Sequence, residues 1–231
     1  MEYENSPEII GQTFDFLNDV FVKQHFADLN IALLNGRHIQ PRDGTLFQLL
    51  DHYFEHFRYY YESLYGLNLD RNTIDNTVYY YLDFPQDIRS KISSPEYSRQ
   101  LTQRETIIGI MLLNMYYERY FDNIKEIHWS NIESEILEGK NSDLYKKMFF
   151  GDIRNSYTPQ EWGLRKSNFK DTLRTFEKLG WIEQHPSVFS DYTDDIHFTL
   201  QPSIHRLASL YGQELEHFNA FVESYYQSKK A

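Results

Sequence analysis

The segment whose residue types and spacing most resemble a catalytic site is His52-Tyr-Phe-Glu55-His56. In the pattern H-x-x-E-H, two histidines four residues apart on a helix bind zinc, and the glutamate acts as a general base. Candidates for a further downstream ligand are Glu118, Glu126 and Glu133. A five-residue pattern arises easily by chance, however, and Phe54 and Phe57 place the same helix in a core. Zinc hydrolysis is therefore only an alternative, and we expect no catalytic residue, metal or cofactor.

Other sequence motifs of catalysis are missing from the 231 residues. There is no P-loop, no G-x-G-x-x-G and no G-x-S-x-G, so nucleotide binding and serine hydrolysis have no support. The remaining histidines, including His185, His197 and His205, do not show the spacing of metal ligands. The chain has no cysteine, which excludes disulfides and thiolate metal sites and is typical of a reducing compartment.

Composition indicates a globular protein with a sizeable core, because 41% of the residues are hydrophobic and 17% aromatic, with 19 Tyr and 17 Phe. No signal peptide is visible, and the most apolar run, Ile107 to Met115, is too short to cross a bilayer. We therefore expect a cytoplasmic, soluble protein with no membrane contact. The formal net charge is −11, so any DNA contact would need a local basic patch or a basic partner.

The elements that would position functional residues begin with helices. Apolar residues recur at helical spacing as far as Leu34, and a second helix is predicted from about Thr45 to Tyr65, with Gly66 as its C-terminal cap. Alternating residues after Gly66 and a β-rich segment at 78–84 predict a hairpin. The polar residues 86–100 are predicted to form a linker or a short irregular helix.

The second half has the same kind of organisation. The capping box Thr102-Gln-Arg-Glu105 predicts the start of an apolar helix that continues to Phe121 and is buried almost all round. A short strand is predicted at 127–129, followed by two short helices. The signal Thr158-Pro159-Gln160-Glu161 starts a longer helix that ends at Gly180.

One order of elements occurs twice: a helix, a glycine, a strand, a polar turn, an aromatic return strand and a proline. The first copy is YGLNLDR…VYYYLDFP and the second is LGWIEQH…IHFTLQP. Helices followed by a β-hairpin describe a winged-helix domain. The predicted fold is therefore mainly α with small β-hairpins, organised as tandem winged-helix domains at residues 1–100 and 101–231.

With both copies laid out, the chain resembles the MukE/MksE family, the accessory subunits of bacterial condensin-like SMC complexes. The order and spacing of all matching segments, over about residues 25–212, carry this resemblance. The segments are LNGRHIQPRDGTLFQLLDHYFEHFRYYYESLYGLNLDR, VYYYLDFP, TIIGIMLLNMYYERYF, IHWSNIESEIL, FKDTLRTFEKLGWIEQH and IHFTLQPSIHRLA.

The resemblance implies a role in assembly rather than a reaction. Subunits of this family are tandem winged-helix proteins that dimerise, bind the kleisin (MukF/MksF-like) and help to hold DNA beside the SMC heads. The ATPase is the SMC partner (MukB/MksB-like). The implied protein is a non-catalytic, nucleoid-associated subunit acting in chromosome organisation and segregation or in plasmid defence. The alternative is a winged-helix transcription regulator that binds operator DNA directly, which the acidic net charge argues against.

The predicted helix at 159–179 occupies the recognition-helix position of the second domain. Its predicted DNA-binding residues are Arg165, Lys166, Lys170 and Arg174. Their offsets place them along one side of the helix, where a basic stripe could contact phosphates. The alternative is a solvated face, with Arg174 and Lys178 partly paired to Asp171, Glu177 or neighbouring residues. Near the helix end, the resemblance leads us to expect two adjacent basic residues, but this chain has Glu177 and Lys178.

A second predicted surface binds a protein partner. Its predicted residues are Tyr59, Tyr60, Tyr79, Tyr81 and Arg37. Side chains alternate along a strand, so Tyr79 and Tyr81 should point away from the core if Tyr80 points in, and exposed rings can anchor an interface. The alternative for the rings is core packing with the hydroxyls at the surface. The alternative for Arg37 is a helix connection in which arginines cap carbonyls.

Overall fold

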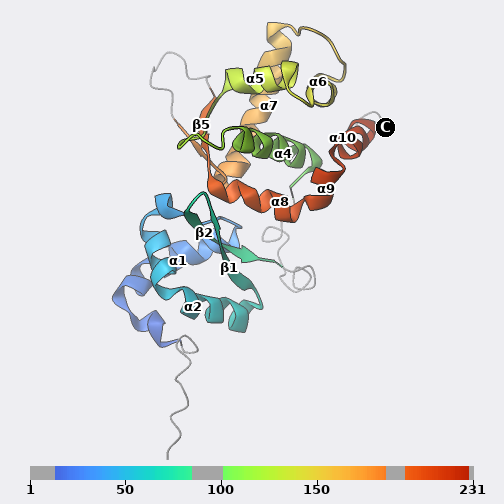
Figure 1. The fold of residues 1–231 in the computed structure, drawn as a ribbon. Coiled ribbons are helices and arrows are strands. Elements are labelled where there is room, and N and C mark those ends of the chain that lie inside the picture. Colours follow the sequence, from blue (N-terminus) through green and yellow to red (C-terminus); the bar gives the residue numbers. More distant parts are fainter. Residues whose placement is uncertain (1–13, 85–100, 186–195, 229–231) are drawn as a thin grey trace, which may run out of the picture. The chain divides into compact units, whose positions relative to one another are not determined.

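The computed structural model describes residues 14–84, 101–185 and 196–228. The chain divides into two compact units, Met1–Arg99 and Gln100–Ala231. Each unit is mostly helical and contains one small antiparallel sheet, as expected from the sequence (Figure 1). The predicted linker and the turn of the second hairpin lie outside the described residues. Among the described helices, none has both the length and the apolar character needed to cross a bilayer.

The first unit contains two long helices and a hairpin. Its elements are η1 (Asp15–Asn18), α1 (Val20–Leu34), η2 (Pro41–Asp43), α2 (Thr45–Tyr65), β1 (Asn68–Ile74) and β2 (Thr77–Asp83). The apolar spacing before Leu34 belongs to η1 and α1, and α1 starts where the Asp19 carboxylate accepts the backbone N–H groups of Phe21 and Val22. Gly66 ends α2 in the left-handed conformation (φ 67°), which confirms the predicted cap.

The two-stranded hairpin of the first unit has a third backbone partner in the segment after α1. Asp75 and Asn76 both have positive φ angles, of 48° and 58°, which is the geometry of a tight hairpin turn. Ile39, in the segment after α1, forms an antiparallel bridge with Tyr80 of β2, and each backbone N–H donates to the other residue's carbonyl at 2.9 Å. Both side chains are fully buried. The return strand is therefore paired on both of its edges.

The second unit has a longer series of elements. These are α4 (Gln103–Glu118), β3 (Glu126–His128), α5 (Trp129–Glu138), α6 (Ser142–Phe150), α7 (Pro159–Lys178), β4 (Ile182–Gln184), β5 (His197–Leu200), η4 (Pro202–His205), α8 (Arg206–Leu210), α9 (Gly212–Glu216) and α10 (Phe218–Ser228). The predicted capping boxes at Thr102 and Thr158 are both confirmed. The helices after η4 have no counterpart in the sequence prediction.

Two predicted details of the second unit are wrong. Helix α4 ends at Glu118, so Phe121 is not part of a buried helix and is 93% exposed. Helix α5 begins one residue before the start expected from the strand at 127–129. The reason is that His128 caps the helix, with its backbone N–H donating to Oδ1 of Asn131 at 2.9 Å, and the indole N–H of Trp129 in the first turn donates to Glu133 at 2.6 Å.

The sheet of the second unit has the strand order β3-β5-β4, and both pairings are antiparallel. Ile127 of β3 lies opposite Phe198 of β5, and both are fully buried in a core that also contains Phe169 and Phe176 of α7. The rings of Trp129 and Phe169 meet edge to face at 5.6 Å. Helix α7 and the sheet therefore share one hydrophobic core.

Helix α8 covers α4 at a glycine. A Cβ atom added to Gly109 would lie 2.4 Å from Cδ1 of Leu207, a fully buried side chain, and 3.4 Å from the ring of Phe176. Gly109 therefore permits the close approach of α8. In contrast, a Cβ atom added to Gly163, on the exposed side of α7, would meet no atom within 4 Å.

This difference predicts opposite effects of one substitution at two helical positions. Gly109→Ala should lower the free energy of unfolding by about 1–3 kcal/mol, because Leu207 must shift in a packed core. Gly163→Ala, the matched control, should raise it by up to about 1 kcal/mol through helix propensity. Urea denaturation measures both values, and equal effects of the two substitutions would contradict the packing of α8 on α4.

The hydrogen bonds of Glu161 at the start of α7 predict that the stability of the fold depends on pH. Hydrogen bonds from the Arg154 guanidinium and from the Thr158 backbone lower the pKa of Glu161 from 4.5 to about 2. A lowered pKa in the folded state means that the carboxylate stabilises the fold fully above about pH 4.5, and that this contribution disappears as the pH falls through about 2.

Glu161→Gln should therefore lower Tm at pH 7, and the difference from the unsubstituted protein should shrink as the pH is lowered from 4.5 toward 2. Glu138→Gln, at an exposed position, controls for the loss of one negative charge. A difference in Tm that stays constant across this range would show that the Arg154–Glu161 contact does not stabilise the helix start.

Candidate nucleic-acid and partner interface

The first two predicted DNA-binding residues lie against aromatic rings. The Arg165 guanidinium lies 5.8 Å from the ring centre of Phe150 in α6, and Nζ of Lys166 lies 5.7 Å from that of Trp129 in α5. Both side chains are half-buried. Rings at this distance attract a cation, so they hold the two charges close to the surface of α7 instead of leaving them fully extended in solvent.

The other two predicted residues continue along the same helix. Lys170 is half-buried, and Arg174 is exposed and donates to Asp171 at 2.6 Å. This is the pairing that the sequence left open as the alternative. Both partners are more than 60% exposed, so the ion pair is worth little and an incoming phosphate could replace the carboxylate. The four basic residues thus belong to one helix but have different surroundings.

The acidic residue near the end of α7 has a structural role. The Glu177 carboxylate accepts the backbone N–H of Gln184 at 3.1 Å and its side-chain amide at 2.7 Å. Gln184 is the last residue of β4, so Glu177 attaches the hairpin to the helix. This contact accounts for an acid at a position where the family resemblance suggested a base. Sequence spacing also missed Arg104 of α4, which donates to the carbonyl of Asn168 in α7 at 2.9 Å.

The predicted exposure of the strand tyrosines is wrong. Tyr80 faces α2 and donates to Asp51 at 2.8 Å, and Tyr79 and Tyr81 lie on the other face of β2, so the alternation itself is confirmed. Tyr79 is nevertheless fully buried and Tyr81 is only 9% exposed. The ring of His38, from the segment after α1, stacks on Tyr81 at 5.4 Å and lies 6.0 Å from Tyr79. The face of β2 that points away from α2 is thus buried as well, and the ring of His38 contributes to covering it.

The remaining predicted partner residues also have contacts within the first unit. Tyr60 is buried, and this burial, together with a hydrogen bond to Tyr65, raises the pKa of its hydroxyl to about 12. Tyr59 is half-buried, with its ring 5.5 Å from that of Phe14. Arg37 donates to the Asp43 carboxylate at 2.6 Å. Tyr59 is the member of the set that keeps the most accessible ring.

In contrast to these buried rings, four neighbouring apolar side chains of the second unit are exposed. They are Tyr117, Tyr120, Phe121 and Ile124, which follow one another at the end of α4 and in the turn before β3, with exposed fractions of 49%, 61%, 93% and 64%. The rings of Tyr120 and Phe121 meet edge to face at 5.3 Å. Large apolar side chains gathered on a surface are typical of protein-interaction sites. We call these four residues the α4 patch.

A cavity of about 670 Å³ lies between α4, the connection from α5 to α6, and α9 and α10. Its walls include Glu118, Glu135 and Glu216, with Lys140 at the same site. Burial, and then the charge of Glu118, raises the pKa of Glu135. The lining is acidic, which disfavours a phosphate and favours a cationic group from a partner. Tyr117 belongs both to this lining and to the α4 patch.

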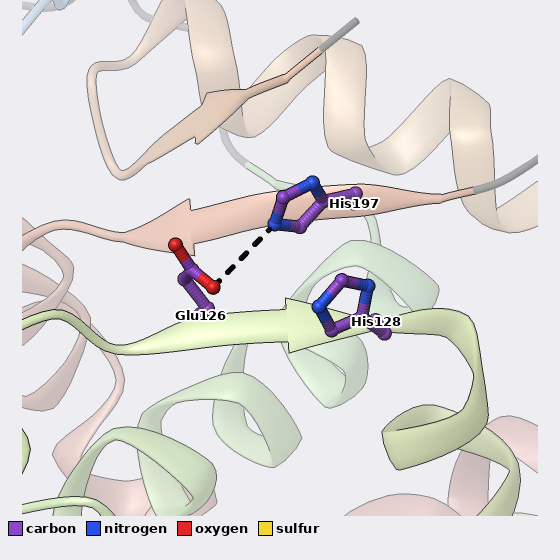
Figure 2. A group of neighbouring side chains, drawn as sticks. All are labelled: Glu126, His128 and His197. Carbon is purple, nitrogen blue, oxygen red and sulfur yellow. Dashed lines mark ion pairs between the residues drawn. The ribbon is translucent and has the colours of Figure 1, made fainter. Parts of the chain in front are cut away.

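The H-x-x-E-H segment does not form a metal site in the structure. His52 and Glu55 are exposed on α2, Glu55 lies 3.2 Å from Arg58, and the ring of His56 packs 5.3 Å from that of Phe16. Among the described residues, the one group of His, Asp and Glu side chains close enough to share an ion is elsewhere. It consists of Glu126, His128 and His197 (Figure 2).

No curated protein matches the sequence. Among protein families, residues 24–211 match the family described as condensin complex protein MksE. The match begins within α1, includes α2 and the hairpin of the first unit, and extends through α7 and the sheet to the end of α8 in the second. Because it spans most of the 231 residues, the chain belongs to the MksE family of condensin complex proteins.

Proposed function

We propose that the chain is a non-catalytic subunit of a MukBEF/MksBEF-like condensin. In this proposal it docks onto a kleisin, and through the kleisin onto an SMC ATPase, as a homodimer that helps to hold DNA at the SMC heads on the nucleoid. The observation that carries the proposal is the family match over residues 24–211, which extends across both compact units. The biological outcome would be chromosome organisation and segregation or plasmid defence.

The arrangement of the second unit supports a winged-helix interpretation. A helix (α4), a short strand (β3), further helices ending in α7, and a hairpin (β4 and β5) follow one another. The return strand β5 lies between β3 and β4 in the sheet. A winged helix requires this order, in which the strand that precedes the second helix pairs with the return strand of the wing.

The first unit supports a second copy of the same module. Helix α1 is followed by Ile39, which pairs with the return strand β2 at Tyr80, as β3 pairs with β5 in the second unit. Helix α2 is interrupted at Tyr53, whose backbone angles (φ −112°, ψ 26°) are not helical. Its two halves take the places of the second and third helices of a winged helix. These correspondences favour tandem winged-helix domains.

Helix α7 is the proposed DNA-contacting element. It has the recognition-helix position, and it carries Arg165, Lys166, Lys170 and Arg174. Phosphate contacts by such residues are independent of base sequence and are weakened by salt. The net charge of −11 makes strong DNA binding by the isolated chain unexpected, so the proposed contact operates within the assembled complex.

The α4 patch is the proposed kleisin-docking surface. It exposes three aromatic rings, the side-chain type that most often anchors protein interfaces. Tyr59 in the first unit is a second candidate anchor. Tyr60, Tyr79 and Tyr81 are buried within this chain. They could therefore contribute to a partner surface only by packing beneath the residues that touch the partner.

Affinity purification of the protein from its native cell tests the assembly. Recovery of a kleisin and a large coiled-coil ATPase is the expected result. Recovery of neither, combined with tight binding of one operator sequence by the isolated protein at physiological salt, would favour the transcription regulator instead.

For DNA, we predict that Lys166→Glu combined with Lys170→Glu weakens retention of DNA by the assembled complex. The slope of log K against log salt concentration should decrease in magnitude by roughly 2, because two phosphate contacts are lost. Lys23→Glu with Arg58→Glu changes the charge by the same amount at exposed positions of the first unit and should leave the slope unchanged. Equal slopes for both double variants would exclude α7 as the contact.

For the partner, Tyr120→Ser combined with Phe121→Ser should weaken kleisin capture by about thirtyfold or more, since loss of an anchor costs about 2 kcal/mol or more. Both side chains are exposed, so the circular dichroism spectrum and Tm should change little. Ile153→Ser with Leu164→Ser removes two exposed apolar side chains elsewhere in the second unit and should leave capture intact. If Tyr59→Ala abolishes capture and the double variant does not, the docking surface lies in the first unit.

A further inference from the structure

The sheet of the second unit has a polar face that neither the core nor α7 uses. In the register of β3 and β5, His128 lies opposite His197, and Ile127 lies opposite Phe198. Ile127 and Phe198 are fully buried, so their neighbours along each strand point to the opposite face. Glu126, two residues before His128, joins the two histidines on that face (Figure 2).

These three side chains bring their donor atoms close together. One ligand atom from each lies within 4.8 Å of the others. The rings of His128 and His197 stack at 4.2 Å with an angle of 11° between them, and Oε2 of Glu126 lies 3.8 Å from Nε2 of His197. Because the residues come from two paired strands, the backbone pairing maintains this spacing.

We propose that Glu126, His128 and His197 bind a divalent transition-metal ion, with Zn²⁺ as the best-matched ion. Two imidazole nitrogens and one carboxylate oxygen are a donor set that zinc uses in proteins, whereas Mg²⁺ and Ca²⁺ favour oxygen donors alone. The proposal concerns metal binding, and it is independent of the assembly role proposed above.

The geometry allows the three donors to meet with small movements. Donors 2.0–2.2 Å from a tetrahedral zinc ion are about 3.3 Å apart, so the widest gap must close by roughly 1.5 Å. Rotation of side chains about χ1 and χ2 is sufficient for this, because Glu126 and His128 are exposed and His197 retains 28% of its side-chain accessibility. The same exposure gives an ion direct access from solvent.

The surroundings contain a further imidazole. His185, which follows β4, has its ring 4.8 Å from that of His197, and its Nε2 lies 2.7 Å from Oγ1 of Thr199. With three ligands from the protein, the fourth position of the ion would hold water or this ring. The bound ion would link β3 to β5 and thereby stabilise the sheet against which α7 packs.

Isothermal titration of the purified full chain with Zn²⁺ tests the proposal. The expected result is one equivalent of zinc bound, with an affinity that falls by roughly tenfold or more in His128→Ala and in His197→Ala. Glu126→Gln should also weaken binding. His52→Ala is the matched control, since it removes an exposed histidine of the H-x-x-E-H segment and should leave binding unchanged.

A second measurement separates loss of a ligand from loss of the fold. Zinc should raise the Tm of the unsubstituted protein and of His52→Ala, and should not raise that of His128→Ala, whose exposed side chain is not needed by the core. Absence of stoichiometric binding in the unsubstituted protein would show that the three residues form a cross-strand ion pair and ring stack only. Binding that survives in His128→Ala and His197→Ala, or is lost in His52→Ala, would equally overturn the site.

Discussion

The backbone pairing between the return strand of each hairpin and a segment that precedes the long helix is the constraint on which both units depend. In the first unit it is a single bridge, from Ile39 to Tyr80, and in the second it is the β3–β5 ladder. A two-stranded hairpin is marginally stable alone, and a third partner gives it a buried face. The pairing therefore connects residues that are distant in the chain and fixes the sheet on the helices. The positions of the candidate surfaces on α7, on the hairpins and on the polar sheet face depend on this pairing.

Aromatic residues fill the first unit, and buried tyrosine hydroxyls there donate hydrogen bonds to polar side chains. The Tyr61 hydroxyl donates to Asn30 at 3.1 Å, and the Tyr80 hydroxyl donates to Asp51 at 2.8 Å. Burial raises the pKa of both hydroxyls, so they act as neutral donors in the core at any physiological pH. The high tyrosine content thus contributes to packing first, and only a minority of the rings is left for contacts with partners.

Elements with local start and stop signals could be predicted from the sequence. Thr102 and Thr158 start α4 and α7 through hydrogen bonds to residues three positions away, and Gly66 ends α2 through its own backbone conformation. These interactions are local, so spacing along the chain is enough to identify them. The mainly helical fold with small sheets followed from the same signals.

The features that prediction missed depend on contacts between distant segments. Tyr79 and Tyr81 alternate as expected, but only the folded chain shows His38 against them. The pairing of His128 with His197 requires the register of β3 with β5, which no motif in the chain encodes. Glu177 stands where the resemblance suggested a basic residue on the helix predicted to contact DNA, whereas its carboxylate accepts hydrogen bonds from Gln184 at the end of β4. Local patterns thus predicted the helices and strands, but they could not predict which distant residues meet at a site.

The distribution of indole rings has an experimental consequence. All three tryptophans of the chain, Trp129, Trp162 and Trp181, belong to the second unit, and two of them pack with Phe169 and Phe176 of α7. The first unit contains tyrosine as its near-ultraviolet chromophore and no tryptophan. Fluorescence excited selectively at the indole band consequently reports on the second unit alone, whereas phenol absorbance reports on both units, because both contain tyrosine. Unfolding of the second unit, or binding of a ligand to it, is therefore readable without any label.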